Sequence, residues 1–178
     1  MPSLPCSDPP PLRLDLDPTF QPCETVAGDE LYPNGTFEFN ITRLSAYIVA
    51  AGRFRTEPVA LDDISYGGTS PGLNELTIAA ADLSRPVILA EISPGRYNLI
   101  DGNHRVAKAR REGVASIPAY RIRCPEHVAF LTSTRAYEKY VEYWNSKVDD
   151  ILGTRARRRQ TRSVRVATRS DRRTSEEA

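Results

Sequence analysis

Five consecutive polar residues offer the clearest chemistry in this sequence: Asp101-Gly102-Asn103-His104-Arg105. They follow an apolar strand pattern and precede a short helical pattern, so we expect them at a strand-to-helix corner. The first turn of a helix presents N–H groups that lack helical acceptors, and together with the helix dipole they attract phosphate. His104 and Arg105 would add side-chain donors to such a site. Asp101 could hold a metal ion or accept a proton.

The same five residues also have a purely structural interpretation. Asp-Gly is a common turn, and Asn103 is a good helix N-cap. His and Arg side chains that follow a cap are often only solvated. Because short motifs also match by chance, the phosphate-site and turn interpretations both stay open on these residues alone.

Flanking strands and a helix must hold this corner in place. Apolar runs and turn residues predict strands over 86–92, 96–100 and 117–122, and a short helix over 106–110 that ends at Gly113. The turn Pro94-Gly95 makes the first two strands a hairpin, with the corner at the end of the second strand. Arg85 precedes the first strand, so we expect it near the corner as a further phosphate ligand.

The chain before the corner predicts a short strand at Leu31 and Tyr32, a turn, and then a helix. Asn40 is the expected N-cap, apolar residues at helical spacing predict a helix over 41–51, and Gly52 ends it. Residues 53–84 are harder to interpret. A strand is expected over 59–64, a Gly-rich stretch over 67–72 is interpreted as a linker, and 73–83 is ambiguous.

Beyond residue 122 the pattern predicts a long amphipathic helix that begins near Ser133 or Thr134. Its aromatic residues, Tyr137, Tyr140 and Trp144, are expected to face a core rather than to stack on bases. We expect His127 at the surface or at a boundary, because no ligand partner lies near it in the sequence.

The composition is typical of a globular protein, with 40% hydrophobic and 26% charged residues in a chain of 178. No window approaches the ~20 apolar residues that span a bilayer, and the N-terminus lacks a signal-peptide pattern. We therefore expect a cytoplasmic protein without membrane contact. Cys6, Cys23 and Cys124 form no Cys-x-x-Cys pair, so the cysteines indicate neither a disulfide framework nor a zinc site.

The two ends of the chain differ from its middle. Seven of the fourteen prolines lie in residues 1–22, which predicts a disordered leader over 1–27 and a folded domain over 28–152. Residues 155–178 carry nine arginines and three acidic residues, a net charge of +6, whereas the rest of the chain carries −5. We expect the tail over 153–178 to be disordered and to bind DNA or RNA through its charge, with a merely solubilising tail as the alternative. Its leading arginines are Arg155, Arg157, Arg158, Arg159 and Arg162.

The order of these parts resembles the ParB/sulfiredoxin superfamily over roughly residues 30–122. The resemblance rests on Pro33-Asn34 before a helix, the strand start Arg85-Pro86-Val87, the corner at 101–105, and Gly113 ahead of Ile117-Pro118. It implies an α+β domain with a small mixed sheet and short helices, here with an added C-terminal amphipathic helix. It also implies a bound nucleoside triphosphate, ATP or CTP with magnesium. The phosphates would lie at Gly102, Asn103, His104 and Arg105, with Arg85 nearby.

Members of this superfamily differ in how they use the nucleotide. ParB partition proteins bind CTP and slide on DNA, free-serine kinases with an Asp-Gly-His-His-Arg corner phosphorylate a small hydroxyl compound, and sulfiredoxins repair oxidised peroxiredoxin. Asn103 stands where sulfiredoxins carry their nucleophilic cysteine, so that repair has no chemical route here. The full partition mechanism is not expected either, because no helix-turn-helix pattern or evident dimerisation domain follows residue 122.

Three functions remain. The preferred one is a ParB-like nucleotide-binding module that associates with nucleic acid through its tail, as a partition or mobile-element protein would. The alternative is an ATP-dependent small-molecule kinase or phosphohydrolase, in which Asp101 accepts a proton from a hydroxyl compound or water. The third is a ParB-like nuclease, whose candidate carboxylates are Asp101 and scattered residues such as Asp62, Asp63 and Glu75.

Overall fold

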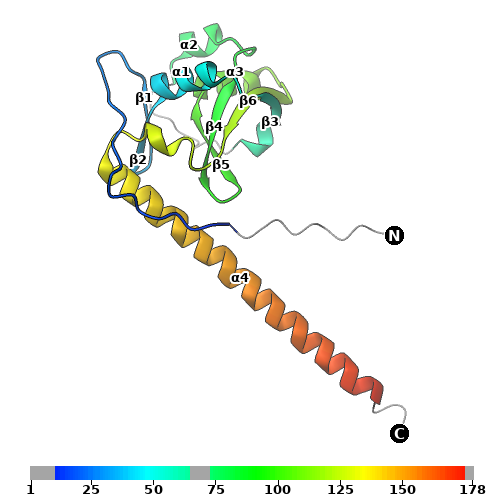
Figure 1. Ribbon diagram of the computed structural model, residues 1–178. Helices are drawn as coiled ribbons and strands as arrows, with labels where there is room; N and C mark the ends of the chain where they lie inside the picture. Colours follow the sequence, from blue (N-terminus) through cyan, green and yellow to red (C-terminus); the bar gives the residue numbers. More distant parts are fainter. Residues whose placement is uncertain (1–10, 65–72, 175–178) are drawn as a thin grey trace.

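A computed structural model describes the backbone of residues 11–64 and 73–174, and side chains up to residue 154 (Figure 1). A four-stranded sheet with the order β3-β6-β4-β5 forms its centre. The strands are β3 (Thr56–Ala60), β4 (Val87–Ser93), β5 (Arg96–Asp101) and β6 (Ser116–Ile122). β4 pairs in parallel with β6 and the other pairs are antiparallel, which confirms the predicted α+β class with a small mixed sheet.

The remaining elements are a hairpin, four helices and two short 3-10 turns. They are β1 (Leu31–Asn34), β2 (Phe37–Asn40), α1 (Ile41–Ala51), η1 (Leu61–Asp63), α2 (Glu75–Ala80), α3 (Asn103–Arg111), η2 (Val128–Phe130) and α4 (Thr134–Thr174). The helices of the described ranges are all too short or too polar to cross a membrane.

Both faces of the sheet are covered, which explains the uninterrupted apolar run along β4. Ile88 and Ala90 belong to a core shared with α1 and α4, whereas Val87 and Leu89 belong to a second core shared with α3. Successive residues of a strand alternate between the two faces, so a strand buried on both sides needs no polar residues. The doubly covered sheet holds the ends of β4 and β5, where the corner lies.

The helix predicted over 41–51 is confirmed with both of its ends. Asn40 Oδ1 accepts a hydrogen bond from Arg43 N at 3.0 Å, and Gly52 ends the helix with a φ of 61°. The bounds of α1 could be predicted from the sequence because a capping side chain and a left-handed glycine act within a few residues of the helix ends.

The stretch 53–84 differs from expectation in two places. The strand lies at Thr56–Ala60 rather than 59–64, and Pro58 is tolerated inside it because β3 is an edge strand. The ambiguous stretch 73–83 contains α2, whose N-cap Asn74 accepts from two backbone N–H groups. The Gly-rich stretch 67–72 lies outside the described residues.

His127 is fully buried, so its expected surface position is wrong. Its Nδ1 lies 3.3 Å from the carbonyl oxygen of Arg123, and its Nε2 lies 3.1 Å from the hydroxyl of Tyr140. That hydroxyl donates to the carbonyl oxygen of Glu91 in β4 at 2.9 Å. The partners of His127 come from α4 and from the residues that follow β6, and no pattern local to residue 127 indicates them.

Helix α4 begins at Thr134 as predicted, with Ser133 Oγ accepting from Ala136 N at 3.1 Å. Its aromatic residues face the core, as expected: Tyr137, Tyr140 and Trp144 are all buried. The helix then continues to Thr174 and extends away from the sheet (Figure 1), where we expected a disordered tail from residue 153. Residues 154–174 contain neither glycine nor proline and are rich in arginine, which has a high helix propensity.

The expectation of a disordered leader is wrong for residues 11–27. Residues 11–20 run as an extended strap along α4, and the chain then leaves this helix toward β1, where Cys23 N donates to Leu131 O (Figure 1). The strap is held largely through its backbone. Asn145 binds both backbone groups of Leu14, accepting from its N at 2.8 Å and donating to its O at 2.9 Å. Trp144 Nε1 donates to Leu12 O at 3.0 Å, and the ring of Phe20 stacks on Tyr137 at 4.0 Å. The proline-rich composition of this segment predicts disorder. The residues that hold the segment in place lie more than a hundred positions further along the chain, so no local pattern indicates them.

Candidate functional site

The polar corner lies where β5 turns into α3, as its sequence predicts. Gly102, rather than Asn103, is the N-cap of α3, and it adopts a φ of 100° in the left-handed region. A Cβ at this position would lie 2.5 Å from Val87 Cγ1, closer than packed atoms allow. The turn therefore requires glycine for two structural reasons, its backbone conformation and the contact with β4.

Arg105 fastens this corner to the start of β4. Its Nη1 donates to the carbonyl oxygen of Pro86 at 2.6 Å, and its Nη2 donates to Asp101 Oδ1 at 2.8 Å. The side chains of Arg105 and Asp101 are only 15% and 18% exposed. The two charged groups thus neutralise each other within the corner, and the guanidinium connects β4, β5 and α3.

An open cleft of about 790 Å³ lies against the corner. This volume falls within the usual range for small-molecule sites. Its walls come from β1, the first turns of α1, helix α2 and the corner itself, with Arg85 on the segment before β4. The lining includes all five corner residues together with Tyr32, Pro33, Thr42, Ser45, Thr77 and Arg85. The structure therefore brings Arg85 and the corner residues together at one cavity.

The N-terminus of α3 faces this cleft with backbone donors. The first helical hydrogen bond of α3 runs from Val106 N to Gly102 O at 3.0 Å. The N–H groups of Asn103, His104 and Arg105 precede it and have no acceptor within the helix. They therefore offer an anion site with the positive end of the helix dipole behind it.

Three side chains of α3 contact α2 and hold it as one wall of the cleft. Lys108 Nζ donates to Ala79 O at 3.0 Å and to Ala81 O at 2.8 Å, which satisfies the C-terminal carbonyls of α2. Glu75 forms a two-pronged ion pair with Arg111 of α3, with distances of 2.5 and 2.9 Å. The backbone N of Asn74 approaches His104 Nε2 at 3.5 Å, which engages the corner histidine with the start of this wall.

Sequence reasoning missed the hydroxyl groups and the aromatic residue of the cleft. Thr42 and Ser45 lie three residues apart on α1, beside its buried stripe, and Tyr32 comes from β1. A signal for the two hydroxyls was present, since a polar pair at helical spacing next to an apolar stripe marks the helix edge at the core boundary. Nothing local indicates that Tyr32 shares a cavity with residue 102.

Carboxylates are present in the cleft, but they do not form a compact cluster. Glu30, Asp82 and Asp101 line it. Hydrogen bonds from Ser84, first from its hydroxyl and then from its backbone N, hold the pKa of Asp82 below its ordinary value. Among the described residues, no group of three or more His, Cys, Asp or Glu side chains is placed to hold a metal ion.

Of the carboxylates considered for a nuclease, only Asp101 lies at this site. Asp62 and Asp63 belong to η1, and neither lines the cleft. Glu75 is paired with Arg111. The arrangement therefore gives no geometric support to metal-dependent strand cleavage by these three residues.

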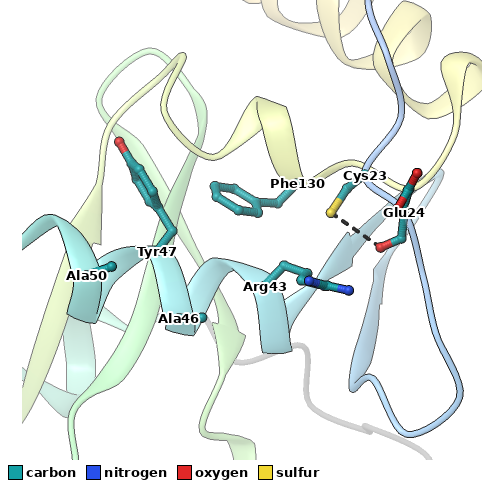
Figure 2. Close-up of a pocket in the computed structure, with 7 residues that line it drawn as sticks. All are labelled: Cys23, Glu24, Arg43, Ala46, Tyr47, Ala50 and Phe130. Carbon is teal, nitrogen blue, oxygen red and sulfur yellow. Dashed lines mark hydrogen bonds between the residues drawn. The ribbon is translucent and has the colours of Figure 1, made fainter.

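A second hollow, of about 510 Å³, lies beside α1 on the side of η2 (Figure 2). Figure 2 shows Tyr47 and Phe130 along it, with Cys23 and Arg43 toward the other end. Its lining is mostly apolar, and burial raises the pKa of the Cys23 thiol, which makes the reactive thiolate scarcer. This hollow offers less chemistry than the cleft at the corner.

Comparisons of the chain with protein-family models, with curated proteins and with solved structures found no match.

Proposed function

We propose that this chain is a nucleotide-binding module that associates with nucleic acid, with the cleft at the corner as its site for a nucleoside triphosphate. One observation carries the proposal: the N-terminus of α3 and the Arg85 side chain share a cavity of nucleotide size. Helix N-termini and arginine side chains are the groups that proteins use most readily for phosphate.

The cavity also suits the rest of a nucleotide. Thr42 and Ser45 offer hydroxyl groups to a ribose or base, and Tyr32 and Pro33 of β1 contribute apolar side chains to the lining. Mg²⁺ that accompanies a nucleotide takes most of its ligands from phosphate oxygens and water, so a single carboxylate of the cleft, Glu30 or Asp82, would be enough to complete its coordination. When bound, the magnesium would neutralise part of the phosphate charge.

The geometry favours binding over phosphoryl transfer. A kinase or phosphohydrolase of this kind needs Asp101 to accept a proton, yet its Oδ1 is bonded to Arg105 at 2.8 Å. The basic tail, which a small-molecule kinase does not need, supports the module rather than the enzyme.

The nucleic-acid part of the proposal rests on the arginine positions along α4. Arg155, Arg158, Arg162, Arg165, Arg169 and Arg172 are spaced alternately three and four residues apart. The backbone is helical through Thr174, and in a helix this spacing returns to one face. A linear array of positive charge suits the phosphate backbone of DNA or RNA. Arg157 and Arg159 add to the charge at other helix positions.

Two assays test the proposal. A thermal-unfolding scan with saturating ATP or CTP and magnesium should raise Tm, because a ligand at about a hundred times its Kd stabilises by about 2.7 kcal/mol. Anisotropy of a labelled DNA duplex should report binding that weakens steeply with salt and is lost when Arg158, Arg162 and Arg165 are changed to Gln. Unchanged Tm with both nucleotides would reject the nucleotide site, and salt-independent DNA binding would reject the interface.

A further inference from the structure

We propose that a groove between the β4–β5 turn and α4 is a second contact site for the nucleic-acid backbone, which extends the arginine face of α4 onto the folded domain. This inference rests on the proposed association with nucleic acid. The groove measures about 640 Å³, and Arg96, Tyr143, Lys147, Asp150 and Thr154 line it. It is separate from the nucleotide cleft, because the two cavities have no lining residue in common.

The groove is locally positive in a domain that is acidic outside its tail. Arg96 comes from the start of β5 and Lys147 from α4, and Asp150 is the single acidic residue of the lining, so the local net charge is +1. Residues 1–154 as a whole carry −5. Positive charge concentrated in a hollow of an acidic protein attracts a polyanion there and repels it elsewhere.

Two side chains of the groove are held in place by neighbours. Lys147 Nζ lies 5.4 Å from the ring centre of Tyr143 and 3.3 Å from Asp150 Oδ2. The Tyr143 ring in turn contacts Phe37 of β2, with ring centres 5.9 Å apart. The lysine is therefore held over the groove rather than extended freely into solvent. The Thr154 hydroxyl beside it donates to the carbonyl oxygen of Asp150 at 2.8 Å, so the positive donors of the groove are Arg96 and Lys147.

The groove and the arginine positions share one side of α4. Tyr143, Lys147 and Thr154 are separated by four and seven residues, and position 158 follows four residues after Thr154. The arginine series then continues through 162, 165, 169 and 172 with the same helical repeat. A single phosphate backbone that follows this face of the continuous helix would reach the groove.

The opposite side of α4 is occupied by the strap. Arg13 of the strap pairs with Asp149, the neighbour of Asp150, and Asn145 binds the backbone of Leu14. In a helix, adjacent residues lie about 100° apart, so Asp149 and Asp150 belong to different faces. The strap therefore leaves the groove side of α4 open to a partner.

The first test measures salt-dependent anisotropy of a labelled DNA duplex with the full chain. The double variant Arg96→Gln/Lys147→Gln should weaken binding on the order of tenfold. The slope of log affinity against log salt concentration should also become less steep, by the amount that about two phosphate contacts contribute. The matched control Arg13→Gln/Arg53→Gln removes the same charge from residues that do not line the groove, since Arg13 pairs with Asp149 on the strap side and Arg53 pairs with Glu126. It should lower the affinity much less and leave the slope near the wild-type value.

A gain-of-affinity pair completes the test. Asp150→Asn removes the acidic group of the groove and should tighten binding severalfold, whereas Asp149→Asn makes the same charge change on the strap side and should have a smaller effect. Equal effects within each matched pair would overturn the groove site and leave only net charge. If the wild-type chain binds no DNA at low salt, the proposed association itself fails, and the groove site fails with it.

Discussion

Arg105 Nη2 donates to Asp101 Oδ1 at 2.8 Å, and this ion pair spans the glycine turn that joins β5 to α3. The sequence suggests Arg105 as a phosphate ligand and Asp101 as a proton acceptor, and the structure shows that the two residues also hold the corner together. We infer that Arg105 acts on the cleft mainly by holding the N-terminus of α3 in place. The backbone N–H groups and Arg85 are left as the more direct ligands.

Arg105→Ala should destabilise the fold. The change removes the donor to Pro86 O and leaves Asp101 unpaired in a mostly buried position, a loss of about 1–3 kcal/mol. Arg105→Lys keeps the charge but not the forked geometry, and it should recover only part of that loss. Urea denaturation monitored by tryptophan fluorescence measures both variants. If the urea midpoint of Arg105→Ala equals that of the wild type, the ion pair does not stabilise the fold.

Gly102→Ala should cost more than the same change at Gly113. Both residues have positive φ, 100° and 68°, but only at Gly102 would the new Cβ meet Val87, at 2.5 Å, whereas at Gly113 it meets nothing within 4 Å. We expect a loss of at least about 2 kcal/mol at Gly102 and about 1 kcal/mol at Gly113.

A double-mutant cycle with Val87→Ala separates the clash from the backbone strain at Gly102. If the clash contributes, Gly102→Ala should cost less when Val87 is already alanine, and the free energies of unfolding should not add. Strictly additive values would contradict the close packing of the turn on β4.

Acid should destabilise the fold through His127. Burial lowers the pKa of this imidazole from 6.5 to about 4, so below pH 6.5 the unfolded chain takes up a proton that the folded chain does not. The stability present above pH 6.5 is therefore lost as the pH falls toward 4, by up to about 3 kcal/mol. The Gln side chain of His127→Gln does not titrate. The urea midpoint should therefore fall less between pH 7.5 and pH 4.5 in this variant than in the wild type. An equal fall in both proteins would contradict the buried neutral histidine.

The strap should become more mobile when the hydrogen bonds between Asn145 and Leu14 are removed. Asn145→Ala deletes both hydrogen bonds to the backbone of Leu14, whereas Ser146→Ala at the next position alters only a bond within α4. Hydrogen exchange should accelerate at Leu14 N and Asp17 N in the first variant only, with a stability loss of about 1–2 kcal/mol. If exchange at these amides matches the wild type, the strap is held by other contacts.

The parts of the fold that depend on nearby residues could be predicted from the sequence. The bounds of α1 follow from Asn40 and Gly52, the hairpin of β4 and β5 follows from Pro94-Gly95, and the corner follows from Asp101-Gly102. In each case a capping or turn residue lies within a few positions of the structure that it determines.

The parts that depend on distant residues could not be predicted. The strap on α4 and the burial of His127 both need partners that are remote or specific to the packed fold, such as Asn145 for Leu14 and Tyr140 for His127. The same holds for the site. The corner was predicted from its motif, but the ion pair inside it, and the contribution of Tyr32 and Thr42 to the cavity, follow from packing.

Titration calorimetry of the full chain with ATP and with CTP, each with magnesium, tests the central proposal most directly. It should be run on the wild type, on Arg85→Ala in the cleft, and on Arg53→Ala, whose arginine pairs with Glu126 away from the cleft. We predict one bound nucleotide per chain, a loss of about tenfold in affinity for Arg85→Ala, equal to about 1.4 kcal/mol, and little change for Arg53→Ala. Preference for CTP would favour the partition-like module, and preference for ATP the kinase-like alternative. Absence of binding by the wild type, or equal affinities for the two variants, would contradict a nucleotide site at this corner.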